Sequence, residues 1–251
     1  MSEARHLRVI IAEALGSTPR ETGAEMIVTA DDVAGSIGGG ALEYMAIDRA
    51  RQMLAAGEAE AAMDVPLGPA IGQCCGGRVR LVLDRRPASP PVPGPSVLVF
   101  GAGHVGRALA HALLPLPVQV RLIDSRAAEL AQAPGIPATL TPLPEAEIRT
   151  APPGSAFVMV THDHALDFLL AAEALARPDA AYVGMIGSRT KRAAFARHAA
   201  AAGVDPARLV CPLAPRAPRD KRPAVIAAFA AAEILAAVLA AAPSSASRVP
   251  A

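Results

Sequence analysis

The feature that most constrains this chain of 251 residues is a glycine-rich segment at residues 97–106, Val-Leu-Val-Phe-Gly-Ala-Gly-His-Val-Gly. It begins as an apolar run rich in β-branched side chains, turns on Gly-x-Gly-x-x-Gly, and continues into residues 107–114 with helical spacing. A strand, a tight turn and a helix in this order open the βαβ unit of dinucleotide-binding folds. We therefore predict a Rossmann-type parallel sheet, flanked by helices, over residues 97–242.

The three glycines of this segment have different predicted roles. Gly101 permits the turn, Gly103 allows a phosphate to approach the backbone, and Gly106 allows the helix to pack closely on the strand. His104 lies between them and is included among the predicted cofactor-binding residues. The next predicted strand ends at Asp124, which is placed to accept hydrogen bonds from a ribose. These residues predict a nucleotide-type cleft, although folds of this class host many unrelated functions.

Two polar loops follow predicted buried strands at residues 156–161 and 180–186. Because the carboxyl ends of parallel strands meet at one edge of a sheet, we expect both loops to lie along the same edge as the glycine-rich turn. The second loop opens a helix and forms a further candidate phosphate cradle, which consists of Gly187, Ser188 and Arg189.

The first of these loops contains His162, Asp163 and His164. Two histidines two positions apart are common on loops that bind no metal, and aspartate is a favoured residue directly before a helix. We interpret the three residues as a polar cap of the next helix, with metal binding as the alternative. No element is predicted for the proline-containing residues 134–154.

The first 88 residues predict a small α/β domain. Residues 7–15 have apolar side chains at helical spacing and predict a short helix, whereas residues 25–29 and 79–83 predict strands. A longer helix is predicted over residues 41–56.

Three glycines directly precede this longer helix: Gly38, Gly39 and Gly40. Free backbone N–H groups and the helix dipole point the same way at such a start, which favours an anion. With Arg20 available in the segment Gly-Ser-Thr-Pro-Arg, we predict a phosphate-type site. A flexible turn with a glycine cap is the alternative.

Two adjacent cysteines, Cys74 and Cys75, lie in the segment Gly-Gln-Cys-Cys-Gly-Gly at residues 72–77. Adjacent cysteines rarely form a disulfide because the ring is strained, and no second cysteine pair exists to complete a four-sulfur zinc site. Thiolates on an open turn bind soft metals or take part in sulfur chemistry, and the neighbouring Arg78 can lower the thiol pKa. Two small buried residues in a strand turn are the alternative.

A proline-rich segment separates the two predicted domains. Residues 84–96 contain five prolines, which are typical of a semi-rigid spacer. We predict an N-terminal domain over residues 1–88, a linker over residues 89–96, and a disordered tail over residues 243–251.

Composition excludes several classes of function. The net charge of +1 gives no reason to expect nucleic acid or an anionic membrane as partner. The N-terminus lacks a signal sequence and three cysteines cannot form a disulfide framework, so a cytoplasmic protein is predicted. Residues 224–242 are apolar but rich in alanine and carry Glu233, which indicates a closing helix packed on the sheet rather than a membrane span.

Six segments occur in one order and together resemble the XdhC/CoxI family of xanthine dehydrogenase accessory proteins. They are residues 16–20, 35–43, 72–77, 100–106, 161–164 and 185–191. The resemblance extends over residues 7 to about 240, and the Gly-Gln-Cys-Cys-Gly-Gly element is its most specific part. The family usually has Cys-Pro-Ile-Gly near the C-terminus, whereas this chain has Ala214 in place of the glycine.

The resemblance implies a maturation factor rather than a metabolic enzyme. Such a protein binds the molybdenum cofactor (molybdopterin), holds it while a cysteine desulfurase supplies the terminal sulfido ligand, and delivers it to the molybdenum subunit of apo-xanthine dehydrogenase. The resemblance further implies that Cys74 and Cys75, with Gln73 beside them, hold the cofactor, and Cys74 and Cys75 suit molybdenum as soft ligands. We also expect a homodimer.

Two alternatives from other classes stay open. The first is an NAD(P)-dependent oxidoreductase that uses the glycine-rich turn and Asp124, although this leaves the motifs of the first 80 residues unexplained. The second is a thiol-based redox or nucleotide sensor that works without molybdenum.

Overall fold

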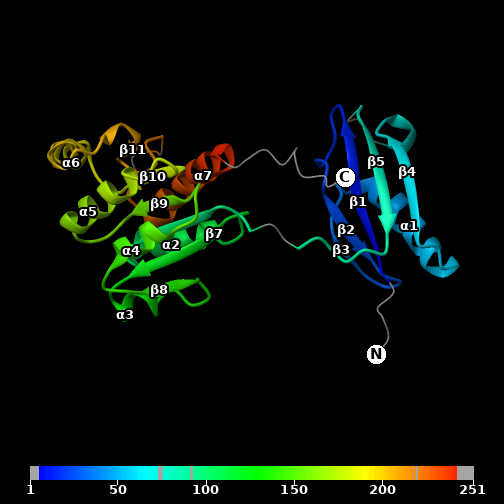
Figure 1. Cartoon of the computed structure of the whole chain (residues 1–251), viewed down its shortest axis with the longest axis horizontal. Coiled ribbons are helices and arrows are strands. Elements are labelled where there is room, and N and C mark those ends of the chain that lie inside the picture. The colour runs from blue at the N-terminus through cyan, green and yellow to red at the C-terminus, as the bar shows by residue number, and fades with distance from the viewer. Residues whose placement is uncertain (1–5, 73–75, 91–92, 217, 219, 242–251) are drawn as a thin grey trace. The chain divides into compact units, whose positions relative to one another are not determined.

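The computed structural model describes residues 6–72, 76–90, 93–216, 218 and 220–241 (Figure 1). The chain divides near residue 91 into two compact units, each with its own sheet and hydrophobic core. Gln73, Cys74, Cys75 and the predicted tail lie outside the described residues.

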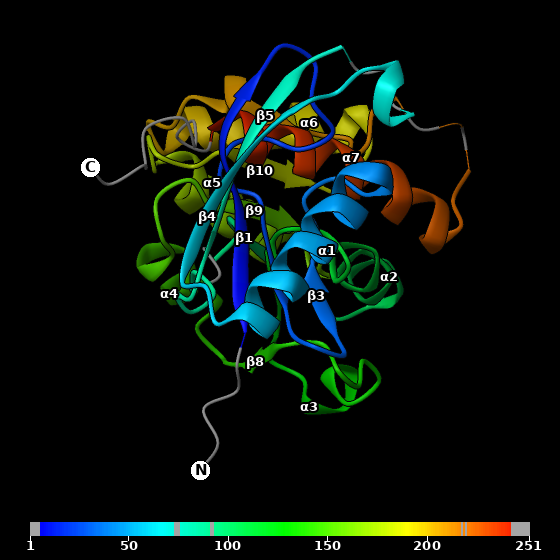
Figure 2. The same ribbon diagram turned by 90° about the vertical axis from the view of Figure 1, so that its right-hand side faces the viewer.

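The N-terminal unit is a five-stranded antiparallel sheet in the order β3-β2-β1-β5-β4 (Figure 2). Helix α1 buries Leu42, Ala46, Ala50, Met53 and Leu54 in the core of this unit. In chain order the elements are β1 (Leu7–Leu15), β2 (Glu25–Val28), β3 (Val33–Gly35), α1 (Gly40–Ala56), β4 (Glu60–Pro66), the 3-10 helix η1 (Pro69–Ile71) and β5 (Arg78–Asp84).

The predicted helix at residues 7–15 is wrong, because this segment is the central strand β1. Its apolar residues fit a helical period, but they also alternate, and Leu7, Val9 and Ile11 are all fully buried. Three consecutive β-branched residues favour a strand, and pairing with both β2 and β5 decides the outcome. The predictions for α1, β2 and β5 are confirmed, whereas β3 and β4 were not predicted.

The start of the predicted linker is bound to the N-terminal unit. The backbone N–H and the hydroxyl of Ser89 lie 2.7 Å and 2.9 Å from the carboxylate oxygens of Glu25. Next to them, the Arg8 guanidinium donates to Asp84 at 2.7 Å in a nearly buried ion pair. The chain is therefore held to this unit as far as residue 89.

The second unit contains a six-stranded sheet in the order β11-β10-β9-β6-β7-β8, in which every neighbouring pair is parallel. This is the strand order of dinucleotide-binding folds, with the order reversing between β6 and β9. The elements are β6 (Ser96–Phe100), α2 (His104–Leu113), β7 (Gln119–Asp124), α3 (Ala127–Leu130), β8 (Ala138–Leu140), α4 (Pro144–Thr150), β9 (Ala156–Met159), α5 (His164–Leu175), β10 (Tyr182–Met185), α6 (Arg189–Ala201), the 3-10 helix η2 (Pro206–Arg208), β11 (Leu209–Val210) and α7 (Pro223–Ala241).

Helices cover both faces of this sheet (Figure 1). Helices α2 and α7 share one core cluster with the strands, and α4, α5 and α6 share the other. Strands β9 and β10 are buried along their whole length, as expected for parallel strands covered on both sides. The prediction of a Rossmann-type sheet is confirmed, and the unassigned residues 134–154 form β8 and α4.

Helix α7 is long and apolar enough to cross a membrane by length and composition, with a mean hydropathy of 2.3. Core helices meet the same criterion, and α7 contributes Ala227, Ala230, Ile234 and Val238 to the core. Its carboxylate, Glu233, accepts a hydrogen bond from the Tyr182 hydroxyl on β10 at 2.7 Å. The helix therefore packs on the sheet, and its charged residue has a partner there.

Candidate functional site

The motif loops of the N-terminal unit lie at one end of its sheet. Leu15 pairs with Arg78, which also pairs with Pro66, and Gly35 pairs with Met26. Because the strands are antiparallel, the end of β1, the end of β3 and the connection between β4 and β5 all lie toward the same end of the sheet. The segment after β1 then contacts both Gly38 and Gly77. Three motifs that are far apart in the sequence are thus gathered into one loop cluster.

Two glycines hold the segment 16–20 in this cluster. A Cβ atom on Gly77 would lie 2.2 Å from the carbonyl oxygen of Ser17, so only glycine fits there. Gly38 has a φ of +125°, and a Cβ atom on it would lie 2.6 Å from Cβ of Pro19 and 3.5 Å from Cγ of Arg20. The segment is therefore clamped between Gly77, which faces its backbone, and Gly38, which faces the side chains of Pro19 and Arg20.

The segment that carries the cysteines is closed at its base. The Leu67 N–H donates to the Gly77 carbonyl and the Gly76 N–H donates to the Leu67 carbonyl, both at 2.8 Å. The chain thus leaves the hairpin after Leu67 and returns at Gly76, beside the clamped segment. The ligand roles predicted for Gln73, Cys74 and Cys75 stay predictions.

The glycine loop before α1 has an acceptor within the chain. Of the three glycines predicted to bind an anion, Gly38 donates its N–H to Oε1 of Glu43 at 3.2 Å, and the preceding Ile37 N–H donates to the same oxygen at 2.9 Å. The Ser36 hydroxyl donates to the same oxygen at 2.7 Å. Partial burial would raise the pKa of Glu43, but these bonds and one from Gly39 outweigh it and lower the pKa. The anion held by this loop is therefore the chain's own carboxylate.

In the Rossmann unit, the loops after β6, β9, β10 and β11 lie in a row along the carboxyl edge of the sheet. Backbone hydrogen bonds join them: the Val160 N–H donates to Phe100 at 2.9 Å, the Ile186 N–H to Met159 at 2.8 Å, and the Leu213 N–H to Met185 at 3.1 Å. The prediction that residues 161–164 and 187–192 lie along the same edge as the glycine-rich turn is confirmed.

Each glycine of the Gly-x-Gly-x-x-Gly turn has a distinct environment. Gly101 has a φ of +109°, and a Cβ atom on Gly106 would lie 1.8 Å from the Gly101 carbonyl oxygen, so both positions require glycine. Gly103 has a φ of −68° and nothing within 4 Å of a Cβ atom placed there. Glycine at residue 103 is therefore required neither by backbone strain nor by packing. The open space beside it is what a ligand needs to approach the backbone there. The exposed His104 follows as the first residue of α2.

Asp124 is engaged by donors of the chain itself. Its Oδ2 accepts from the Ala102 N–H at 2.7 Å and from the Arg126 guanidinium at 2.8 Å, and its Oδ1 accepts from the N–H and Nε of Arg126 at 2.9 Å and 3.0 Å. Burial raises the pKa of Asp124, but the bonds from Arg126 and Ala102 outweigh this effect, so the pKa lies below its usual value. A carboxylate has about four acceptor positions. A ribose would have to displace one of these donors, so the geometry disfavours the predicted contact.

A buried ion pair joins the two remaining motif loops. The Lys191 Nζ donates to Oδ2 of Asp167 at 2.5 Å, and the two side chains are 8% and 0% exposed. The other oxygen, Oδ1, accepts from the Thr161 N–H at 3.1 Å and lies 2.8 Å from the Thr161 hydroxyl. This network fixes the loop after β9 against the start of α6. Asp163 caps α5 through the N–H groups of Ala165 and Leu166, as its polar-cap interpretation predicted.

The polar residues that shape these loops were not singled out from the sequence. Glu43 and Lys191 lie within the segments that carry the family resemblance, and Asp167 follows the loop of His162, Asp163 and His164, but none of the three is among the predicted site residues. A carboxylate in the first turn after a glycine loop signals reciprocal capping. A single acidic residue on the inner face of an apolar helix signals a buried partner.

The predicted cradle of Gly187, Ser188 and Arg189 is also partly used by the fold. The Ser188 hydroxyl accepts from the Lys191 N–H at 3.2 Å and so caps α6. A Cβ atom on Gly187 would lie 2.8 Å from Cδ of Lys191 and 3.2 Å from Sγ of Cys211. Glycine is needed there by packing, while the exposed Arg189 remains available to a ligand.

Cys211 is buried behind this loop, with 2% of its surface exposed. Burial raises the pKa of its thiol, and the nearby Lys191 and Arg192 only partly oppose this effect. In a Cys74→Ser/Cys75→Ser variant we expect the remaining thiol to react with iodoacetamide at least about tenfold more slowly than free cysteine. Its rate should rise to that of free cysteine in denaturant. Fast alkylation of the native protein would contradict the buried position.

Ala214 lies where the family resemblance leads us to expect glycine. Among the described residues it is the one non-glycine position with a positive φ, of 53°. That conformation costs a residue with a Cβ atom about 1–2 kcal/mol. The loop after β11 therefore has a backbone shape that favours glycine, although the chain carries alanine there.

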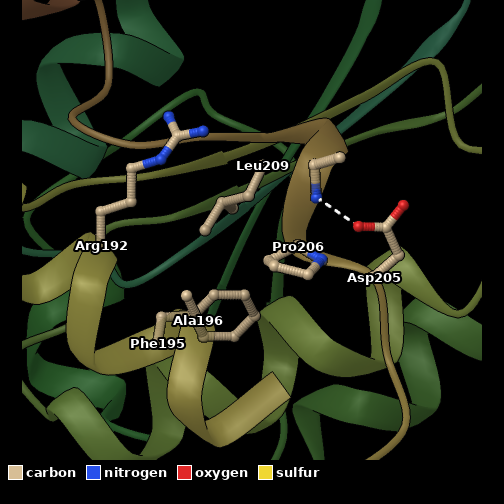
Figure 3. A pocket seen from close by; sticks show the side chains of 7 residues that line it. Arg192, Phe195, Ala196, Asp205, Pro206 and Leu209 are labelled. Atoms are coloured by element: carbon tan, nitrogen blue, oxygen red, sulfur yellow. Dashed lines mark hydrogen bonds between the residues drawn. The ribbon is translucent and has the colours of Figure 1, made fainter. Parts of the chain in front are cut away.

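The cavities of the Rossmann unit lie apart from these loops. One of about 270 Å³ is formed by Phe195, Ala196, Pro206 and Leu209, with Arg192 and Asp205 at its margin (Figure 3). Asp205 caps η2 through the Ala207 N–H at 2.9 Å, the bond drawn in Figure 3. A second cavity, of about 450 Å³, lies at the amino ends of β6 and β7. Over the part of the chain that the structure describes, no group of three or more His, Cys, Asp or Glu could hold a metal ion.

The chain was compared with known proteins. The family model described as XdhC Rossmann domain matches residues 97–234, more than half of the chain, and the one described as XdhC and CoxI family matches residues 3–65. The uncharacterized protein YqeB of Escherichia coli K12 is 31% identical over 118 residues, which cover 45% of this chain and 21% of YqeB. The chain thus spans about a fifth of that relative.

A crystal structure from Bacillus halodurans, described as a xanthine dehydrogenase, is similar in fold. Its TM-score is 0.79 at 15% sequence identity, over 97% of this chain and 94% of that chain. At such low identity the likeness concerns the fold alone. The family assignment follows from the matched sequence models, which include both the glycine-rich turn and the segment 16–20. The chain belongs to the XdhC and CoxI family.

Proposed function

We propose that this protein is a maturation factor for xanthine dehydrogenase in the cytoplasm. It binds the molybdenum cofactor, holds it while a cysteine desulfurase supplies the terminal sulfido ligand, and delivers it to the molybdenum subunit of the apo-enzyme. In this proposal it is a homodimer and catalyses no metabolic reaction of its own.

One observation carries the proposal: the loop cluster at the end of the N-terminal sheet. Segment 16–20, Gly38 and Gly77 converge at the base of the segment that contains Cys74 and Cys75. Molybdenum that is already held by sulfur is matched by soft thiolate ligands. A carrier must also release its cargo, so a few exchangeable ligands on a loop suit it better than a closed cage.

The oxidoreductase alternative is weakened by the environment of Asp124. That alternative assigns the Asp124 carboxylate to the ribose of NAD(P), but the carboxylate is bound by Ala102 and Arg126. The open approach to Gly103 suits a phosphate of the cargo equally well. The glycine-rich turn by itself therefore does not indicate hydride transfer.

The test is reconstitution of a client enzyme. Protein purified from a molybdate-fed host that also makes cysteine desulfurase is mixed with apo-xanthine dehydrogenase, and xanthine oxidation is followed. We expect activity to appear in proportion to the added protein. The same protein from a host unable to synthesise the cofactor should give none. If the loaded protein retains cofactor in the presence of the apo-enzyme and no activity appears, the delivery role is wrong.

A further inference from the structure

We infer that the segment 17–20 binds a phosphate monoester, the terminal phosphate of the cargo, and that the glycine loop 38–40 does not. This assignment rests on the proposed function for the identity of the ligand. It concerns a subsite that must recognise a doubly charged oxyanion at one end of a larger molecule.

The glycine loop cannot supply the subsite without losing an internal partner. Its N–H groups of Ile37 and Gly38 are bound to Glu43, together with the Ser36 hydroxyl. A phosphate entering there would have to displace a carboxylate held by several hydrogen bonds. It would also lie beside a negative charge, because Glu43 is ionised at neutral pH.

Residues 17–20 carry free donors in this cluster. Ser17 is exposed and Thr18 is half-buried, and their hydroxyl groups make no hydrogen bond with any described residue. The Arg20 side chain is 43% exposed, and Glu21, 3.8 Å away, is its one ion-pair partner among the residues described. A guanidinium group with adjacent hydroxyls is a common arrangement for binding phosphate.

Two glycines allow this segment to lie close against the neighbouring loops. A Cβ atom on Gly77 would lie 2.2 Å from the Ser17 carbonyl oxygen, and one on Gly38 would lie 2.6 Å from Cβ of Pro19. These close approaches place the side chains of Ser17, Thr18 and Arg20 within the loop cluster.

The experiment uses two fluorescent probes that contain neither molybdenum nor reactive sulfur. They are the oxidised pterin monophosphate obtained from the cofactor and the same pterin after phosphatase treatment. Full-length protein from a host that lacks the cofactor is titrated with each. We expect the wild type to bind the phosphorylated probe at least about tenfold more tightly, since charge-assisted hydrogen bonds are the strong ones. Arg20→Gln should reduce this ratio to about threefold or less and leave the binding of the other probe unchanged.

A matched control is Arg49→Gln. Arg49 lies on α1, its side chain is 34% exposed, and it pairs with Glu58 rather than facing the loop cluster. This variant should keep the wild-type ratio, and both variants should unfold at the wild-type temperature.

The outcomes separate this inference from the proposed function. If neither probe binds the wild type, the subsite is wrong, while the cofactor role, which rests on thiolates and molybdenum, is decided separately by reconstitution of the client enzyme. If both bind and Arg20→Gln keeps the preference for phosphate, only the subsite is wrong. A preference lost in Gly103→Val but not in Arg20→Gln would instead place the phosphate on the Rossmann unit.

Discussion

Replacing Lys191 by methionine is expected to lower the free energy of unfolding of the Rossmann unit by about 3–5 kcal/mol. The variant leaves Asp167, which has no exposed surface, with the Thr161 N–H and hydroxyl as its nearest partners. An unpaired buried carboxylate loses its hydration without compensation, which is why removing one partner of a buried pair is so costly. Urea unfolding followed by circular dichroism measures the change.

Two further variants show whether the charge is the cause. Arg149→Met removes a solvent-exposed pair with Glu173 at a similar distance, 2.6 Å, and should lower the stability far less, because water screens the two charges. Asp167→Leu combined with Lys191→Met should recover part of the loss, because no buried charge then remains. If Lys191→Met and Arg149→Met lower the free energy of unfolding by the same amount, the buried Asp167–Lys191 pair does not stabilise the loops.

Replacing both Cys74 and Cys75 by serine is expected to abolish activation of apo-xanthine dehydrogenase. Serine is close to cysteine in size but is a poor ligand for a metal already held by sulfur. Each single variant should lose most of the activation, because two exchangeable thiolates are proposed to hold the molybdenum together. The measurement is xanthine oxidation after mixing with the apo-enzyme, at equal concentrations of folded protein.

The control for this experiment is Cys211→Ala. Cys211 is buried in the Rossmann unit, with its Sγ against Gly187, and is not proposed to touch the cargo. That variant should keep wild-type activation, even if it unfolds at a lower temperature because a buried side chain has been truncated. Full activation by the double serine variant would show that the thiols are not ligands.

The Rossmann unit could be predicted because its signals are local and agree with one another. Apolar strands, a Gly-x-Gly-x-x-Gly turn and helices of regular period follow in order, and parallel topology then places their loops at one edge. The N-terminal sheet was harder, since the central strand β1 has apolar residues that fit two periods. Only pairing with β2 and β5, which is not local, decides between them.

In the candidate site, too, local signals could be predicted and non-local contacts could not. The sequence predicts candidate binding segments, but it could not show which of their donors already have a partner within the chain. Glycine N–H groups predict an anion, and whether that anion is a ligand or Glu43 depends on how the first turn of α1 folds back. Likewise, an acid at the end of β7 predicts a ribose contact, whereas the position of Arg126 turns Asp124 inward.

The central claim, that this protein carries the molybdenum cofactor, is tested most directly by the content of the purified protein. Molybdenum is measured by mass spectrometry and pterin by the fluorescence of its oxidised form, for protein from a molybdate-fed host. We predict molybdenum and pterin in equal amounts in the wild type and a loss of both in Cys74→Ser/Cys75→Ser. A wild-type protein free of molybdenum and pterin, or a double variant that retains both at the wild-type ratio, would contradict the account.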